Sequence, residues 1–254
     1  MVSLSEISKY LDTELAINDI PEDMSNNGLQ IEGASEVNKI IFGVDACLEL
    51  SKIAAEKEAD LIFVHHGLSW RDGFKRLTGH SAKIFSMLFK NDISLYAAHL
   101  PLDAHPELGH NAQIAKKLNL EDAKSFCEYA KVDIGIMGEL VEPTIAEALS
   151  SLIDKELNTE SKVYGNLDKS ISRIGIISGG PGSMGIEAAH DNNLDCLITG
   201  EIGHSNWHLI NDLDLTVITA GHYRTEVPGV IAVMEEIQKK FDVDCEFVDL
   251  PTGL

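Results

Sequence analysis

Apolar runs that alternate with amphipathic segments constrain the fold of this chain more than any other feature. The run at 61–64 is Leu-Ile-Phe-Val, and Gly67 follows shortly after it, which is typical of a short buried strand. The runs at 39–45 and 93–99 have the same character, and segments with helical spacing separate the three. Strand, helix and strand in succession predict a parallel α/β unit whose sheet is flanked by helices.

The second half of the chain repeats this alternation. Further strands are predicted at 132–140, 172–178, 195–199, 215–220 and 245–248, and further helices at 144–157, 183–192, 205–213 and 226–240. The polar stretch 121–124 predicts a connection between two halves. We therefore predict an α/β protein of two lobes, 1–123 and 124–254, in which the last helix and strand, about 226–254, are candidates to pack back on the first lobe.

Charge and cysteine usage narrow the class of protein. The chain has 41 acidic and 20 basic residues and a formal net charge of -21, which disfavours nucleic acid as the main partner. The 4 cysteines are widely spaced, as expected of free thiols in a reducing compartment. The first residues predict an amphipathic helix, and no apolar run is long enough for a membrane span. We expect a cytoplasmic protein with no membrane partner.

Two adjacent histidines end the strand at 61–66. Neighbouring side chains of a regular strand point to opposite faces, so His65 and His66 can share one site only where the backbone leaves the pleat. Gly67 permits such a break. The alternative, one histidine in the core and one on the surface, is the commoner arrangement for an isolated pair.

Other potential ligands follow two more predicted strands. Asp103, near His99 and His105, follows the strand at 93–99, and His222 and Glu226 follow the strand at 215–220. In α/β sheets, ligands bind beyond the carboxyl ends of strands. Pro228 belongs in a first helical turn, so Thr225 is the expected N-cap and His222 is expected in the preceding loop. Taken alone, Glu226 is more readily explained as a first-turn acid that the helix dipole favours.

Imidazole and carboxylate donors together suit Zn, Fe, Mn or Co. Five ligands are too many for one tetrahedral ion, and two ions bridged by Asp103 fit better. Such a pair can hold a bridging hydroxide and supply a nucleophile near neutral pH, which is hydrolytic chemistry. The metal ligands predicted in this way are His65, His66, Asp103, His222 and Glu226.

Several other features have two explanations each. The glycine turn at 179–182 could cradle a phosphate, but it lacks a complete phosphate-binding motif, and a tight turn is the commoner use. Trp70 and Trp207 could stack on a base, although packing is the commoner role. The histidines at 99, 105, 204 and 208 are candidates to support ligands or contact substrate, whereas those at 80, 110 and 190 are expected at the surface.

Five motifs, in order along nearly the whole chain, resemble those of the Nif-three-like family, whose members are labelled GTP cyclohydrolase 1 type 2 homologues. They are Asn-Gly-Leu-Gln-Ile-Glu-Gly at 27–33, Val-His-His-Gly at 64–67, His-Leu-Pro-Leu-Asp-Ala-His-Pro at 99–106, Thr-Gly-Glu at 199–201 and Ala-Gly-His-Tyr-Arg-Thr-Glu at 220–226. His110 departs from the resemblance, which predicts a small polar residue there. The match after Glu201 is also loose.

The resemblance implies two α/β lobes with a dinuclear metal site in the cleft between them, and a toroidal homohexamer. It assigns the metal-ligand role to the same five residues and places His99 close to them as a catalytic group. The predicted function is a dinuclear metal-dependent hydrolase of a nucleotide or similar small molecule, with GTP cyclohydrolase-type or phosphoesterase chemistry. The alternative is a non-catalytic toroidal scaffold or regulatory protein that binds metal.

Overall fold

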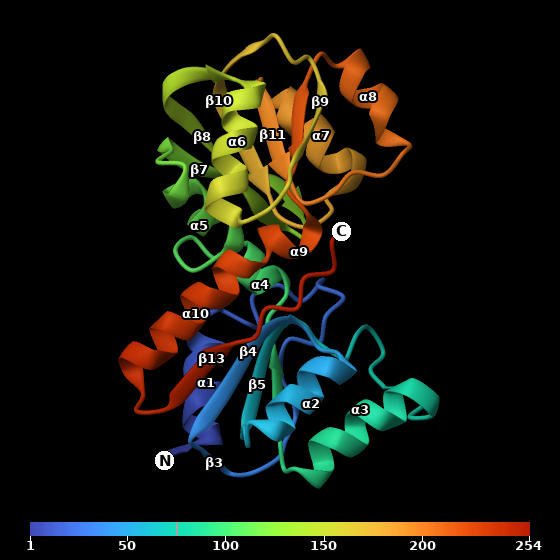
Figure 1. Cartoon of the computed structure of the whole chain (residues 1–254), viewed down its shortest axis with the longest axis vertical. Helices are drawn as coiled ribbons and strands as arrows, with labels where there is room; N and C mark the ends of the chain where they lie inside the picture. Colours follow the sequence, from blue (N-terminus) through green and yellow to red (C-terminus); the bar gives the residue numbers. More distant parts are fainter. Residues whose placement is uncertain (75) are drawn as a thin grey trace. The chain divides into compact units, whose positions relative to one another are not determined.

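The computed structural model describes residues 1–74 and 76–254, which form two compact units (Figure 1). Unit 1 comprises Met1–Leu102 and Val230–Leu250, and unit 2 comprises Asp103–Gly229 and Pro251–Leu254. The structure places the division after residue 102, earlier than the division after 123 that the polar stretch predicts. Residues 103–123 belong to unit 2 because their helix packs into its core, where Ile114 and Leu118 are buried.

Unit 1 is built on a five-stranded sheet. Its strand order is β13-β4-β5-β6-β2, and only β2 runs antiparallel to its neighbour. The strands are β2 (Gly28–Ile31), β4 (Lys39–Asp45), β5 (Leu61–His66), β6 (Ser94–Ala97) and β13 (Asp244–Phe247). A small ladder pairs β1 (Val2–Ser3) with β3 (Glu36–Val37). The parallel strands predicted from the apolar runs are confirmed, and the last strand pairs with β4 in unit 1.

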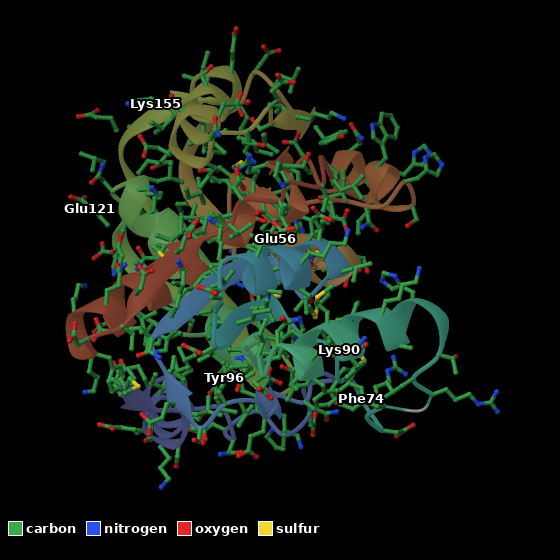
Figure 2. All side chains as sticks on the ribbon, turned by 60° about the horizontal axis from the view of Figure 1, so that its bottom comes forward. Glu56, Phe74, Lys90, Tyr96, Glu121 and Lys155 are labelled. Atoms are coloured by element: carbon green, nitrogen blue, oxygen red, sulfur yellow. The ribbon has the colours of Figure 1, made fainter. Side chains whose placement is uncertain are left out.

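Helices cover both faces of this sheet. The helices α2 (Leu48–Glu56) and α3 (Gly79–Lys90) bury Leu50 and Phe85 against one face, together with Ile62 of β5. The opposite face carries Tyr96 (Figure 2), whose hydroxyl donates to Asp12 of α1 (Leu4–Glu14) at 2.8 Å. Alternation along each strand thus produces two buried faces, as a parallel sheet requires.

Unit 2 contains a mixed six-stranded sheet with the order β7-β8-β10-β11-β12-β9. The central strands β10, β11 and β12 are parallel, and the outer ones are antiparallel. The strands are β7 (Glu121–Tyr129), β8 (Val132–Ile145), β9 (Lys162–Gly165), β10 (Ser170–Ile177), β11 (Cys196–Thr199) and β12 (Thr216–Thr219). The helices α5 (His110–Lys117) and α6 (Ala146–Leu157) pack their apolar faces against this sheet.

The remaining helices complete the chain order. They are α4 (Leu100–Asp103), α7 (Gly182–Asp191), α8 (Asn206–Asp212), α9 (His222–Thr225) and α10 (Val227–Lys240). Within the described part of the chain, no helix combines the length and apolar character that crossing a bilayer requires.

The predicted polar connection at 121–124 is wrong, because these residues begin strand β7. The strands β7 and β8 form an antiparallel hairpin that turns at Ala130 and Lys131, which have positive φ angles of 52° and 65°. Asn-Gly is the usual sequence of such a turn, so the Ala-Lys pair gave no signal of it. The helix predicted at 144–157 begins at Ala146, because β8 continues to Ile145.

Candidate metal centre

Three histidines of unit 1 gather at the carboxyl edge of its parallel strands. His65 and His66 end β5, and His99 follows β6, the next strand in the sheet. The ring centroids are 4.5 Å apart for His65 and His66, and 5.1 Å apart for His65 and His99. One nitrogen of each ring lies within 4.8 Å of one nitrogen of each of the others. The structure therefore brings together the histidine pair and His99, which the sequence placed on separate strands.

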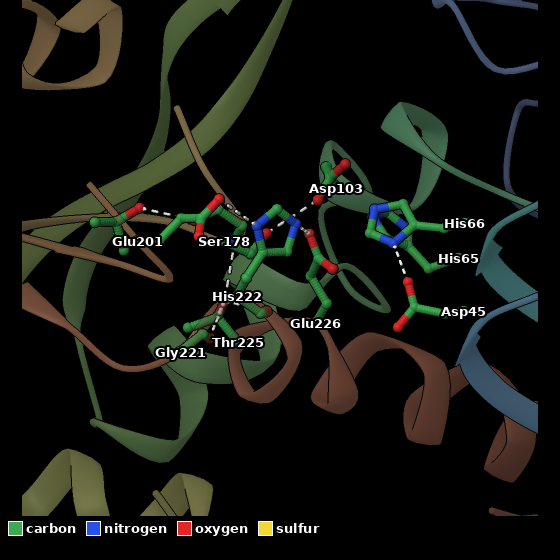
Figure 3. A network of polar contacts seen from close by, with 12 residues as sticks. Asp45, His65, His66, Asp103, Ser178, Glu201, Gly221, His222, Thr225 and Glu226 are labelled. Carbon is green, nitrogen blue, oxygen red and sulfur yellow. Dashed lines mark hydrogen bonds and ion pairs between the residues drawn. The ribbon is translucent and has the colours of Figure 1, made fainter. Parts of the chain in front are cut away.

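The Nδ1 atom of each of these rings has a fixed acceptor. His65 Nδ1 lies 2.9 Å from the carbonyl oxygen of Ala98, which can only accept. The Nδ1 atoms of His66 and His99 each lie 2.8 Å from a carboxylate oxygen, of Asp45 and Asp23 respectively (Figure 3 shows the Asp45 contact). These contacts place the proton on Nδ1 and a lone pair on Nε2, the arrangement that orients a histidine for a metal ion.

Asp23 is the most deeply placed of these supporting groups, with a side chain only 1% exposed. Burial acts to raise its pKa. The contacts with His99, Ser25 N–H and the Asn27 amide outweigh burial, and the net pKa lies below the ordinary value. Asn27 in turn accepts the backbone N–H of His99 at 2.8 Å. Asp23 and Asp45 are supporting residues that sequence reasoning missed, because a lone aspartate in a turn or at a strand end carries no distinctive pattern.

Only glycine fits at position 67, because the Gln30 side chain and Ala97 pack directly against the backbone there. A Cβ atom at position 67 would lie 2.4 Å from the Gln30 side-chain oxygen and 2.6 Å from the Ala97 Cβ. That oxygen accepts the backbone N–H groups of Leu68 and Ser69, so it cannot easily move. The predicted break in the pleat is not seen at His66, which still pairs in register with Asp45.

In unit 2, one histidine is held between two glutamates. His222 Nε2 lies 3.0 Å from Glu226 and His222 Nδ1 lies 3.1 Å from Glu201 (Figure 3). The hydrogen bond to Glu226 is the largest cause of a raised pKa; burial opposes it, and the Glu201 contact adds to it, giving a pKa of about 9. The imidazole is therefore protonated at neutral pH. Two carboxylates directed at one ring make this a place that attracts a cation.

The local backbone differs from the expectation for His222. This residue begins the short helix α9, and Thr225 is inside that helix instead of capping the next one. The Thr225 hydroxyl donates to Gly221 and His222 carbonyl oxygens at 3.0 Å and 2.9 Å. His222 and Glu226 are consequently one helical turn apart, which puts both side chains on one face.

The glycine turn at 179–182 makes room for this pair. Gly179 has a φ of +66°, and a Cβ there would lie 2.5 Å from Glu226 Oε1 and 3.2 Å from His222 Nε2. Its N–H donates to the Thr225 hydroxyl at 3.0 Å. A Cβ at Gly200 would likewise lie 2.7 Å from the Cα of His222. The loops after β10, β11 and β12 therefore meet at the carboxyl edge of the unit 2 sheet.

Asp103 joins the same edge of unit 2 through hydrogen bonds. The Ser178 hydroxyl, directly after β10, donates to Asp103 Oδ1 at 2.9 Å (Figure 3). Asn111 accepts the Ser178 N–H at 2.7 Å and donates to the Ile134 carbonyl at 2.6 Å. This network fixes the Asp103 carboxylate from the side of the sheet. Ser178 and Asn111 are further supporting residues that the sequence did not single out.

His110, expected at the surface, is fully buried in unit 2. Its Nδ1 accepts the N–H of Gly229 at 3.1 Å, and one of its nitrogens lies within 4.8 Å of an Asp103 carboxylate oxygen. With Nδ1 as acceptor, the neutral ring carries its proton on Nε2, which suits a donor to a carboxylate. No local pattern signalled this burial, because Asp103 and His110 lie in different helices and a lone histidine at a helix start is usually exposed.

The other candidates have local roles. His105 Nδ1 accepts the N–H groups of Glu107 and Leu108 at 3.1 Å and 2.9 Å, which stabilises a turn. Trp70 donates to the Gly67 carbonyl at 2.8 Å, and its ring packs edge-on against His99 at 5.0 Å between centroids. Trp207 is 48% exposed on α8 and contacts His208.

Comparison with known proteins identifies the relatives of this arrangement. The sequence model of Duf34/NIF3 (NGG1p interacting factor 3) matches residues 2–252. The chain belongs to the Duf34/NIF3 family. A curated family member from Pyrococcus horikoshii, named GTP cyclohydrolase 1 type 2 homolog, is 45% identical over 250 residues, which is 98% of each chain.

Solved structures of similar proteins share the fold. The protein ybgI, described as of unknown function, superposes with a TM-score of 0.92 at 33% identity and 100% coverage of both chains. Reduced HcgD from Methanocaldococcus jannaschii gives a TM-score of 0.84 at 26% identity over 98% of each chain. The α/β architecture with helix-flanked sheets is thus that of the Duf34/NIF3 proteins.

The donor chemistry of this Duf34/NIF3 protein fits a divalent metal in each unit considered separately. Unit 1 offers imidazole nitrogens whose lone pairs are fixed by acceptors behind them. Unit 2 offers buried carboxylate oxygens beside an imidazole, with Glu226 only 3% exposed. Nitrogen and oxygen donors of this kind suit first-row divalent ions, and the same set accepts several of them.

Proposed function

We propose that this chain is a dinuclear divalent-metal-dependent hydrolase that acts on a nucleotide or a similar small molecule. The orientation of the three imidazoles in unit 1 carries the proposal. Each has its Nδ1 proton directed at an acceptor, and two of these acceptors are carboxylates. Carboxylate–histidine pairs of this form recur behind metal ions in enzymes.

In this proposal the metal ligands are the five residues predicted from the sequence. His65 and His66 would contribute Nε2, Asp103 and Glu226 would contribute carboxylate oxygens, and His222 would contribute a ring nitrogen once it has lost the proton it shares with Glu226. When bound, a pair of divalent ions would lower the pKa of water and provide a nucleophile near neutral pH.

His99 is suited to move a proton. Asp23 holds its Nδ1 proton at 2.8 Å, so Nε2 is the basic atom. Protonation of Nε2 would be stabilised by the adjacent Asp23 carboxylate, as in other histidine–aspartate pairs. Asn27 holds the backbone of His99 in place. His99 therefore acts as the general base or acid of the proposed reaction.

The names of the relatives suggest the reaction. Opening of the guanine ring of GTP by water needs an activated oxygen nucleophile and a group that transfers protons, and the proposed site supplies both. Phosphoester hydrolysis has the same requirements. We propose GTP cyclohydrolase-type chemistry first and phosphoesterase chemistry second, since the fold alone does not fix a substrate.

Elemental analysis of the purified chain tests the metal site. We expect about two divalent ions per chain in the wild type, loss of at least one in Asp103→Ala, and no change in the control Asp212→Ala, whose side chain is exposed on α8. Turnover of GTP should fall with metal content while the fold, followed by circular dichroism, is retained. A wild-type chain that binds no metal after reconstitution would refute the proposal.

The same material tests the alternative function and the assembly. Two bound ions without turnover of GTP or phosphoesters would favour a metal-binding scaffold or regulatory protein. We also propose a homohexamer, with an expected mass by light scattering of about six times the 27.7 kDa of one chain. Dissociation on chelation would indicate that the metal supports assembly.

A further inference from the structure

A large open cavity lies in unit 2, at the same sheet edge as His222. It has a volume of about 780 Å³. Its walls come from the start of β9, the loops after β11 and β12, and the segment Pro251–Leu254. Sites for small molecules and cofactors have volumes of about 300–1,000 Å³ and occur beyond the carboxyl ends of parallel strands. The cavity therefore has the size and the position of a ligand site.

Glu201 connects this cavity to the candidate metal centre. Its carboxylate lines the cavity and also accepts from His222 Nδ1 at 3.1 Å. The side chain is 52% exposed, so it faces solvent on one side and the imidazole on the other. A molecule in the cavity would thus lie next to a group that contacts a proposed metal ligand.

Two basic residues line the cavity of this strongly acidic chain. Lys162 lies at the start of β9, opposite Thr219 in the ladder with β12. Arg224 is in α9, and its guanidinium lies 5.6 Å from the ring centre of the buried Tyr223. This cation–π contact orients the guanidinium. Lys162 and Arg224 offset the two acidic residues of the cavity wall, Glu160 and Glu201, so in a chain of net charge -21 the cavity repels an anion less than the surface as a whole does.

The remaining polar groups suit the other parts of a nucleotide. Glu160 lies on the cavity wall and can accept from a sugar hydroxyl or a base N–H, and the Tyr164 ring offers an apolar face. Lys and Arg are the side chains that bind phosphate best, Arg through two parallel hydrogen bonds.

We propose that this cavity is the substrate site and binds a phosphorylated small molecule of mononucleotide size, with Lys162 and Arg224 on the phosphate. The assignment to substrate rests on the proposed hydrolase function, whereas the binding itself does not require metal. Glu201 would then separate the bound phosphate ester from His222 and the proposed ions.

Calorimetric titration of the full chain tests the site, with GMP, guanosine and inorganic phosphate as probes, before and after metal removal by a chelator. We expect GMP to bind at least about tenfold more tightly than guanosine, and inorganic phosphate to compete with GMP. Lys162→Gln and Arg224→Gln should each weaken GMP binding about tenfold, as expected for loss of a charged hydrogen bond, and leave guanosine binding unchanged. Lys155→Gln is the matched control, because Lys155 (labelled in Figure 2) lies on α6, does not line the cavity and has a side chain that is 79% exposed.

Equal affinity for GMP and guanosine, or GMP binding that neither variant weakens, would overturn the proposal. Arg224→Gln removes a contact with a buried ring and could unfold the chain, but Lys162 is exposed and its variant keeps the test decisive. The two proposals fail separately. GMP binding to chelated protein with the expected variant pattern, but no metal in the native protein, would refute the hydrolase and leave the site. Metal in the native protein, together with GMP binding that the variants do not weaken, would refute the cavity as the phosphate site and leave the hydrolase proposal standing.

Discussion

The two units form candidate metal-binding groups at the same structural position in different ways. Each places its donors at the carboxyl edge of parallel strands, β4, β5 and β6 in unit 1 and β10, β11 and β12 in unit 2. Unit 1 uses imidazoles that are oriented by acceptors behind them. Unit 2 uses carboxylates around a protonated histidine. Unit 1 is therefore preorganised without an ion, whereas unit 2 holds a proton where a metal would replace it.

The largest effect should come from neutralising the buried acid of unit 2. Glu226→Gln keeps the shape but removes the charge that raises the pKa of His222, so we expect this pKa to fall from about 9 toward its ordinary value of about 6.5. Metal affinity should drop about 100-fold or more, because loss of an outer partner alone costs about 10–100-fold and Glu226 is itself a proposed ligand. NMR titration of metal-free protein and chelator competition would measure the two changes, with the exposed Glu235→Gln as control.

The same variant changes how stability depends on pH. In metal-free wild type, protonated His222 contributes stability that is fully present below the unfolded pKa near 6.5 and is lost as pH rises through about 9. Glu226→Gln should remove most of this dependence. A melting temperature of the variant that falls between pH 6.5 and 9 as steeply as that of the wild type would show that the carboxylate is not the cause.

The next largest effect should come from the glycine that makes room for that acid. Gly179→Ala adds a Cβ 2.5 Å from Glu226 Oε1 at a φ of +66°, and we expect it to lower the free energy of unfolding by about 2–4 kcal/mol. Gly182→Ala is a matched control, since its φ is +64° but nothing lies within 4 Å of the added Cβ. Chemical denaturation of both variants separates crowding from backbone strain. Equal losses would show that crowding contributes nothing.

The smallest effect should come from the supporting carboxylates of unit 1. Asp45→Asn leaves the proposed ligand His66 in place but weakens its orientation, so we expect metal affinity to decrease about 10–100-fold. Asp23→Asn acts on His99, which is not a proposed ligand, so we expect it to lower turnover and leave metal affinity unchanged. Asp19→Asn, with an exposed side chain, is the control. Chelator competition measures all three. An Asp45→Asn protein that binds metal as tightly as Asp19→Asn would show that His66 does not depend on this acceptor.

The sequence by itself determined most of the architecture and the identity of the main candidate residues. Apolar runs of strand length with helical segments between them are local patterns, so the parallel strands β4, β5 and β6 followed directly from them. Histidines and acids at strand ends were visible for the same reason. The hairpin of β7 and β8 was not, because its turn uses Ala130 and Lys131 instead of residues that favour positive φ.

Only the tertiary structure decided which groups support those residues and how much space they have. Asp23 lies 76 positions from His99, and Asn111 lies 67 positions from Ser178, so no local pattern could relate them. The burial of His110 depends on Gly229, which is 119 positions away. Hydrogen bonds between distant segments form only when the sheets place those segments together, and the same is true of the close contacts that glycine allows. These contacts set the tautomers and charges of the side chains on which the proposed chemistry depends.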